Sequence, residues 1–289
     1  MASVKSIVRC CAVLLLTVVG LTGCRTDEPP APTFTNWPQS LADFRFRWAA
    51  EPGIDLVSGP AVPLRAYLES YRIAELTREI GDVYPGFERA VPQLPSDSDA
   101  PAQLLSIRPS FEGEPFGPPG PFFGNEFFHI LEITPIEGGY RAYVCDGLYK
   151  IFRDGKEEDE GKYVSVVGYR ARTGLGDVNG MKVWRVEFTD SPPAADAPAK
   201  VTDQSGPNPA PAGDVFGPWR ITGANDAIWG SMVNRESTAD ERVDGAQRLS
   251  QCSDLLPHWR TERDANIRAS LDTPPAAEPA SPGWPEATA

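Results

Sequence analysis

The sequence has few of the residues on which most enzyme chemistry depends. Its 289 residues include only two histidines, His129 and His258, and five cysteines. The nucleophile elbow G-x-S-x-G, the S-x-x-K pair, the zinc motif H-E-x-x-H and the phosphate-binding P-loop are all missing. His129 lies in an apolar strand pattern typical of a core histidine, and His258 lies beside Trp259, which favours a surface or packing role. We therefore expect a protein that is not an enzyme and that holds no metal and no cofactor.

The sequence also lacks an apolar run long enough to cross a membrane. The run from Cys10 to Leu21 has about 12 residues, whereas a spanning helix needs ~20. Lys5 and Arg9 precede it, which is typical of a secretory leader. The sequence LTGC at 21–24 then resembles the bacterial lipobox, which implies that Cys24 carries a diacylglycerol and becomes the mature N-terminus. Two acyl chains suffice for stable anchoring. The alternatives are an ordinary leader with a chance cysteine, or a short core helix.

Proline is abundant, with 30 residues against 26 glycines, and it gathers in a few polar segments. Such segments bury too little apolar surface to fold. We therefore expect a lipoprotein leader, a disordered tether, a single α+β domain with two flexible inserts, and a disordered tail. These parts cover residues 1–23, 24–40, 41–271 (inserts 92–124 and 191–213) and 272–289.

Positive charge is scarce. The formal net charge is −13, and without Lys5 and Arg9 of the leader 25 basic residues face 40 acidic ones, a net charge near −15. No basic patch large enough to neutralise phosphates is expected, so nucleic acid is excluded as a partner. An acidic surface is also repelled by anionic lipid headgroups. We therefore expect contact with the membrane only through the lipid on Cys24, which would place the protein on the extracytoplasmic face of the cell membrane.

The cysteines that remain in the mature domain predict a disulfide. Cys145 and Cys252 are the only pair left in an exported chain, and oxidising compartments favour bonded cysteines. Closing a loop of about 107 residues contributes on the order of 4–5 kcal/mol in the chain-entropy model. By strand alternation, the C-terminal helix must then pack on the sheet face that Cys145 shares with Arg141, Tyr143 and Tyr149. The alternative is two free buried thiols.

Periodicity and turn signals predict the elements of the domain. Phe44, Phe46 and Trp48 alternate in a short strand that ends before Pro52, and helical spacing of apolar residues predicts a helix over 60–81. Turn signals predict two hairpins and a fifth strand, followed by a C-terminal helix that begins with a capping box at 238–241. The hairpins pair 125–133 with 140–152 and 162–174 with 181–190, and the fifth strand covers 216–223. The predicted fold class is α+β, a curved antiparallel meander of four to five strands packed with helices.

An amphipathic helix followed by a curved antiparallel meander resembles the cystatin-like and NTF2-like cone fold over about residues 60–223. A lipocalin-like barrel or a helix-capped β-sandwich would show similar hairpins. The whole chain resembles an actinobacterial, mycobacterial-type secreted lipoprotein of unassigned function. Its lipobox, acidic Pro/Ala-rich tails and single disulfide carry this resemblance, which is one of organisation and brings no catalytic motif.

Aromatic residues on the predicted sheet and helix suggest where a ligand could bind. In a cone fold they would line a pocket on the concave face, or else simply form the core. The candidates are Tyr67, Tyr71, Tyr143, Tyr163 and Trp184. We expect a non-catalytic binding or accessory module of the cell envelope, with an envelope protein or an apolar ligand as its partner. The alternatives are a carrier of a lipid or other apolar ligand in the concave face and, third, an enzyme that uses Asp146 or Glu132 beside a tyrosine.

Overall fold

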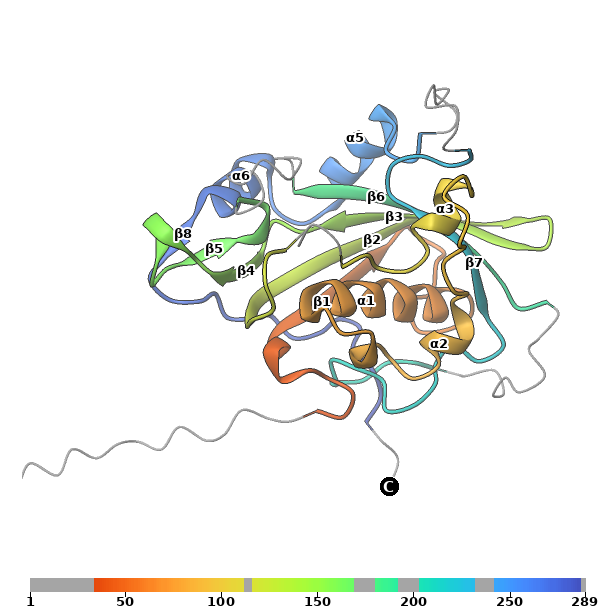
Figure 1. The fold of residues 1–289 in the computed structure, drawn as a ribbon, viewed down its shortest axis with the longest axis horizontal. Coiled ribbons are helices and arrows are strands. Elements are labelled where there is room, and N and C mark those ends of the chain that lie inside the picture. Colours follow the sequence, from red (N-terminus) through yellow and green to blue (C-terminus); the bar gives the residue numbers. More distant parts are fainter. Residues whose placement is uncertain (1–33, 112–115, 169–179, 192–202, 232–241, 287–289) are drawn as a thin grey trace, which may run out of the picture. The chain divides into compact units, whose positions relative to one another are not determined.

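The computed structural model describes residues 34–111, 116–168, 180–191, 203–231 and 242–286 (Figure 1). The predicted leader, the predicted lipidation site Cys24 and the tether up to residue 33 lie outside these ranges. Within them the chain forms an eight-stranded sheet packed with helices, which confirms the predicted α+β class. No helix in these ranges is both long enough and apolar enough to cross a membrane.

The centre of the sheet is a long hairpin. Strand β2 (Phe122–Ile136) pairs with β3 (Gly139–Gly147) in antiparallel register. Ile136 faces Gly139 across the two-residue turn Glu137-Gly138, and Gly138 takes a positive φ of 80°. Two-residue hairpin turns require such backbone angles, which glycine adopts without strain. The first predicted hairpin is therefore confirmed.

The meander continues from β3, but not through the second predicted hairpin. Strand β6 (Met181–Thr189) pairs with β3, and β7 (Arg220–Asn225), the predicted fifth strand, pairs with β6. The prediction that the segment at 162–174 pairs with β6 is wrong, because β5 (Tyr163–Ser165) pairs with β4 (Ile151–Asp154). The nine residues of β3 offer β6 a much longer ladder than the three residues of β5.

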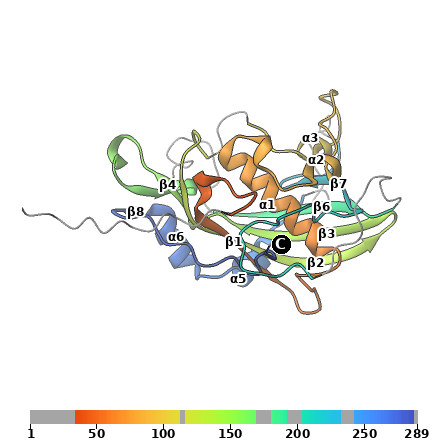
Figure 2. The same cartoon turned by 90° about the horizontal axis from the view of Figure 1, so that it is seen from below.

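The rest of the sheet lies around the first half of β2. Strand β4 pairs with residues 122–124 of β2, and β8 (Ser270–Leu271) pairs with β5. Strand β1 (Asp43–Ala50) runs parallel to β2 and buries alternate residues, as its sequence predicts. The strand order is β7-β6-β3-β2-β4-β5-β8, with β1 on β2, so the curved sheet ends in β7 and β8 and does not close (Figure 2).

Helices cover both faces of the sheet. The longest, α1 (Ala61–Thr77), lies on one face, and α5 (Ala246–Leu255) and α6 (Arg260–Arg268) lie on the other (Figure 2). The remaining elements are short. They are α2 (Phe87–Ala90), α3 (Ala102–Leu105) and the 3₁₀ turns η1 (Gln39–Leu41), η2 (Ile80–Asp82) and η3 (Glu157–Asp159).

Two predicted helix ends differ from the structure. Helix α1 ends at Thr77 rather than Gly81, because Arg78 takes the left-handed conformation and its N–H bonds back to the carbonyl of Ala74. Helix α5 begins at Ala246, after Gly245. The capping box expected at 238–241 lies outside the described residues.

The two predicted inserts contribute buried residues to the domain where the structure describes them. Within 92–124, Ile107 and Phe116 are buried and β2 already begins at Phe122. Within 191–213, Ala210 is buried, while 192–202 lie outside the described residues. The expectation that the proline-rich segment 92–124 holds neither helix nor central strand is wrong at two places, because α3 and the start of β2 lie within it. Its irregular parts still pack their few apolar side chains.

The ends of the domain need the same correction. In the predicted tether, Trp37 is buried and its Nε1 donates to the carbonyl of Leu41 at 2.7 Å. In the predicted disordered tail, residues 272–286 lie against the domain and Trp284 is 1% exposed. A single tryptophan buries enough surface to fix an end whose composition predicts disorder.

Candidate functional site

A buried charge cluster lies between α1 and the sheet. Arg72 of α1 is 1% exposed. Its Nε lies 2.9 and 3.0 Å from the two carboxylate oxygens of Glu126 on β2, and its Nη2 donates to Asp146 Oδ2 on β3 at 2.8 Å. Trp184 Nε1 on β6 donates to the same Asp146 oxygen at 3.0 Å. The Phe116 ring, 4.7 Å from the guanidinium carbon, covers the remaining face of Arg72.

The cluster holds more carboxyl groups than cations. Glu75 pairs with Arg72, and Asp226 pairs with Lys182 Nζ at 2.5 Å. With Glu126 and Asp146 this makes four carboxyl groups around two cations, so full ionisation would leave two uncompensated buried charges. Such charges are costly, and carboxyl groups avoid the cost by keeping protons.

The pKa values follow this balance. Burial raises the pKa of Glu126 well above its usual value, and the neighbouring Asp146 raises it further. Burial also raises the pKa of Glu75, against the opposing effect of Arg72. At Asp226 burial is outweighed by Lys182, so that its pKa is lowered. A neutral Glu126 can donate a hydrogen bond to Asp146, which lets the two carboxyl groups lie side by side.

This cluster has the composition of a general acid–base site but not the access. Glu126 and Asp146 are fully buried. The cavities found among the described residues are lined by other side chains. Glu132, the other acid considered for catalysis, is exposed on the hairpin and lies away from the cluster. Both carboxyl groups of the cluster, Glu126 and Asp146, thus lie sealed in the core beneath α1.

The structure separates the five aromatic residues predicted to share a pocket. Tyr67, Tyr71 and Trp184 meet under α1, with ring centroids 6.0 Å apart for the first pair and 5.0 Å for Tyr71 and Trp184. Tyr143 lies on the opposite face, because side chains alternate along β3, and Tyr163 packs against Phe123 at 5.1 Å. Tyr67, Tyr71 and Trp184 are all buried in the hydrophobic core.

The disulfide predicted between Cys145 and Cys252 is present. It joins the middle of β3 to α5, with the two Cα atoms 5.4 Å apart and both side chains fully buried. Helix α5 packs on the predicted face, since Arg248 lies over the ring of Tyr143. Sequence reasoning therefore placed this helix correctly from one pair of cysteines.

Both histidines have structural surroundings. His129 is nearly buried, and its Nε2 lies 2.9 Å from a carboxylate oxygen of Glu51. His258 stacks edge-on against Tyr149 at the junction of α5 and α6, and burial lowers its pKa. Arg263 holds this junction by donating to the carbonyls of His258 and Ser253 at 2.8 and 3.2 Å. His258 Nδ1 lies 3.3 Å from the Tyr149 hydroxyl, which donates to the carbonyl of Pro257.

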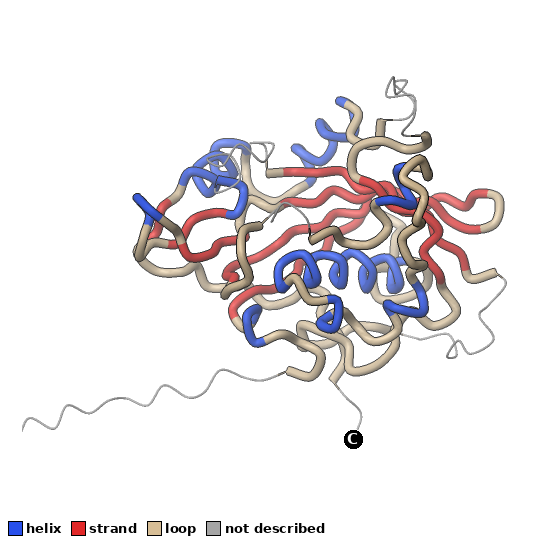
Figure 3. The backbone as a smooth tube through the Cα atoms, in the orientation of Figure 1, coloured by secondary structure: helices blue, strands red, loops and turns tan. Residues whose placement is uncertain are grey.

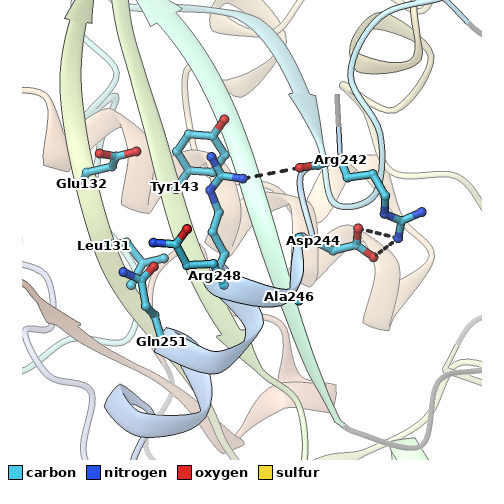
Figure 4. Close-up of a pocket in the computed structure, with 10 residues that line it drawn as sticks. Leu131, Glu132, Tyr143, Arg242, Asp244, Ala246, Arg248 and Gln251 are labelled. Atoms are coloured by element: carbon cyan, nitrogen blue, oxygen red, sulfur yellow. Dashed lines mark hydrogen bonds and ion pairs between the residues drawn. The ribbon is translucent and has the colours of Figure 1, made fainter. Parts of the chain in front are cut away.

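An open groove of about 660 Å³ lies beside the first turn of α5 (Figure 4). It lies between this turn and the hairpin of β2 and β3. Its walls are formed by Leu131, Glu132, Tyr143, Arg242, Asp244, Gly245, Ala246, Gln247, Arg248 and Gln251. Figure 4 shows the Arg248 side chain extending along Tyr143, with its guanidinium carbon 3.8 Å from the ring centroid.

The groove mixes charges of both signs. Arg242 pairs with Asp244, and Arg248 Nη1 lies 3.4 Å from the carbonyl of Arg242. Glu132 lies on the opposite wall (Figure 4). No side chain caps the first N–H groups of α5, which follow Gly245. Such a polar, open surface suits a polar segment of a partner better than an apolar small molecule, which needs an enclosed apolar pocket.

Sequence reasoning did not find the groove. Arg242 and Arg248 belong to no recognisable motif, and the groove depends on how α5 docks onto β3. One feature of the sequence could have indicated it. Cys145 and Tyr143 lie on the same face of their strand, so a disulfide to Cys252 brings the helix that carries Cys252 next to Tyr143.

Comparison with protein family models, with curated proteins and with solved structures finds no match to this chain. Among the described residues, no group of three or more histidine, cysteine, aspartate or glutamate side chains is arranged to hold a metal ion.

Proposed function

We propose that the chain is a lipoprotein on the extracytoplasmic face of the cell membrane, anchored through a diacylglycerol on Cys24. Its domain is a non-catalytic binding or accessory module of the cell envelope. The lipobox supports the anchor, and the large excess of acidic residues leaves the lipid as the main attraction to the membrane. The single observation that carries the binding function is the closed interior, in which Glu126 and Asp146 are fully buried against Arg72 under α1.

The closed interior also weighs against the two alternatives. A carrier of an apolar ligand needs an enclosed apolar cavity, whereas Tyr67, Tyr71 and Trp184 fill the space under α1. An enzyme needs its carboxyl groups within reach of substrate, whereas Glu126 and Asp146 are fully buried. Binding to a partner requires only surface, which the groove beside α5 supplies.

The anchor is tested by mass spectrometry of the native N-terminal peptide and by membrane fractionation. We expect a diacylglyceryl group on residue 24, and release of the protein from the membrane fraction by Cys24→Ala. The matched control is Thr22→Ser, which keeps a small residue in the lipobox and should leave the protein in the membrane. An unmodified Cys24, or cleavage at another position, would contradict the proposal.

The binding surface is tested by photocrosslinking in intact cells. A photoreactive side chain at Gln251, on the rim of the groove, should capture a discrete partner that Arg248→Glu abolishes. The control places the same group at Gln93, which is exposed but far from the groove along the chain. Equal capture from both positions would rule out the groove as the docking site. Capture from Gln251 that is unchanged by Arg248→Glu would also rule it out.

A further inference from the structure

The C-terminal segment Glu278–Pro285, here called the strap, lies on the domain as an extended peptide. It contains no helix or regular strand of its own (Figure 3). On one side it pairs with β1, where Trp48 donates its N–H to the carbonyl of Ser281 at 2.6 Å. On the other side Trp284 and Asn208 exchange two backbone hydrogen bonds, at 2.8 and 3.1 Å.

Most further contacts also go to the backbone of the strap. The Asn125 side chain both donates to and accepts from the backbone of Glu278, at 3.0 and 2.9 Å. Arg65 Nη2 donates to the carbonyl of Pro282 at 2.7 Å, and Arg47 Nη1 donates to the carbonyl of Pro279 at 2.6 Å. Backbone contacts of this kind accept many sequences. They are how sheet edges recognise extended peptides.

One side chain of the strap enters the domain. The indole of Trp284 is 1% exposed, and its Nε1 donates to Glu69 Oε2 at 2.8 Å. The guanidinium carbon of Arg65 lies 4.3 Å from the ring centroid, and the Tyr84 ring meets it edge-on. We call the site formed by Trp48, Arg65, Glu69 and Tyr84 the tryptophan socket.

The socket keeps its buried carboxylate satisfied without the strap. Trp48 Nε1 and the Tyr84 hydroxyl each donate to Glu69 at 2.7 Å, and Arg65 Nε lies 4.0 Å from it. Departure of Trp284 therefore removes one of three donors and leaves Glu69 paired. A buried acceptor that keeps its partners avoids most of the penalty of an unmade hydrogen bond. The residues of the socket thus come from β1, α1 and Tyr84, and none belongs to the strap.

We propose that the β1 edge and the tryptophan socket form a binding site for an extended peptide in which proline and small residues flank a tryptophan, and that the strap occupies this site within the same chain. The occupant from outside is a segment of an envelope protein with the same chemistry, which binds by displacing the strap. This inference rests on the proposed function as a binding module and names a second docking site beside the groove.

The experiment uses the mature, full-length lipoprotein in detergent, with a protease site inserted between Pro275 and Ala276. Cleavage after folding leaves the strap held only by its non-covalent contacts. A fluorescently labelled peptide of residues 278–289 is then added, and its binding is followed by polarisation. We expect the peptide to replace the strap while circular dichroism of the domain stays unchanged.

Matched peptides test the chemistry. Trp284→Ala should weaken binding at least tenfold, while Glu286→Gln, at an exposed position, should bind as the native sequence does. The inference is overturned if the peptide enters only when the domain unfolds, since the strap is then a permanent part of the core. It is also overturned if uncleaved protein forms dimers that Trp284→Ala abolishes, because the outside occupant is then a second copy. Membrane anchoring and crosslinking at the groove are measured in separate experiments. Failure of the peptide to bind would therefore leave the proposed function untouched.

Discussion

The two faces of the sheet are held in different ways. Under α1, charges are buried and paired directly, as with Arg72 between Glu126 and Asp146. On the other face a covalent bond, Cys145–Cys252, holds α5, and the surface stays open beside it. Trp259 there is 81% exposed. The comparison teaches that the charge cluster under α1 is closed to solvent, while the surface beside the disulfide-held helix α5 is open.

The largest effect is expected from removing the cation under α1. Arg72→Met leaves Glu126 and Asp146 buried without their cation, and breaking a buried ion pair in this way costs about 3–5 kcal/mol. Urea unfolding followed by tryptophan fluorescence should show this loss. The control is Glu126→Gln, which keeps the shape of a neutral carboxyl group and should cost far less. Equal losses in both variants would mean that Glu126 is ionised in the folded protein.

The next effect comes from the opposite face. Cys252→Ser should cost about 2–5 kcal/mol, because the unfolded chain regains the freedom of a long loop. The thermal midpoint should fall by several degrees, and a reductant should lower it in the wild type but not in the variant. Ser250→Ala, at an exposed position of the same helix, should change little. An unchanged midpoint on reduction would contradict the role given to the disulfide.

The pH dependence of stability reports on the charge cluster under α1. The folded state keeps protons on Glu126 and Glu75 that the unfolded chain releases above a pKa of about 4.5. Their contribution is complete below that pH and is lost as pH rises through the raised folded pKa values. Asp226 acts in the opposite direction, and its contribution is lost below about pH 3.8.

We therefore expect the free energy of unfolding to fall from pH 5 towards pH 8 in urea titrations, with the disulfide intact throughout. Glu126→Gln should flatten this slope, since it removes the group whose pKa is raised most clearly by burial. A slope that the substitution leaves unchanged would place the titrating groups elsewhere.

The smallest effects on stability belong to the groove and its surroundings. Arg248→Ala removes a cation–π contact with Tyr143 that is worth about 0.5–1 kcal/mol at an exposed site. Trp259→Ala should leave the thermal midpoint almost unchanged, because its side chain is mostly in solvent. If either substitution unfolds the protein in a thermal scan, the groove face is a structural core rather than an accessible surface.

Local patterns predicted the elements that depend on near neighbours. The alternation at Phe44, Phe46 and Trp48, the turn at Glu137-Gly138, and the helix around Tyr67 were each readable from short stretches. One distant contact was also predicted, because Cys145 and Cys252 are the only two cysteines of the mature domain that can pair in an oxidising compartment. The α+β class followed from these pieces.

Features that depend on distant residues were not readable. The contacts of Arg72 with Glu126 and Asp146 could not be predicted from the sequence, because the three residues lie far apart in it, on α1, β2 and β3. The tail around Trp284 reads as disordered by composition, and only the Glu69 socket shows why it is ordered. The resemblance to the NTF2-like cone and the lipid on Cys24 stay predictions.

The most direct test of the central claim, a sealed charge cluster under α1 opposite an open face held by the disulfide, is amide hydrogen exchange with and without reductant. We predict that reduction accelerates exchange in α5 and α6, while α1 and the strands that carry Glu126 and Asp146 keep the protection of global unfolding. Fast amide exchange in α1 of the oxidised protein would contradict the account. So would an exchange rate in α5 that is the same with and without reductant.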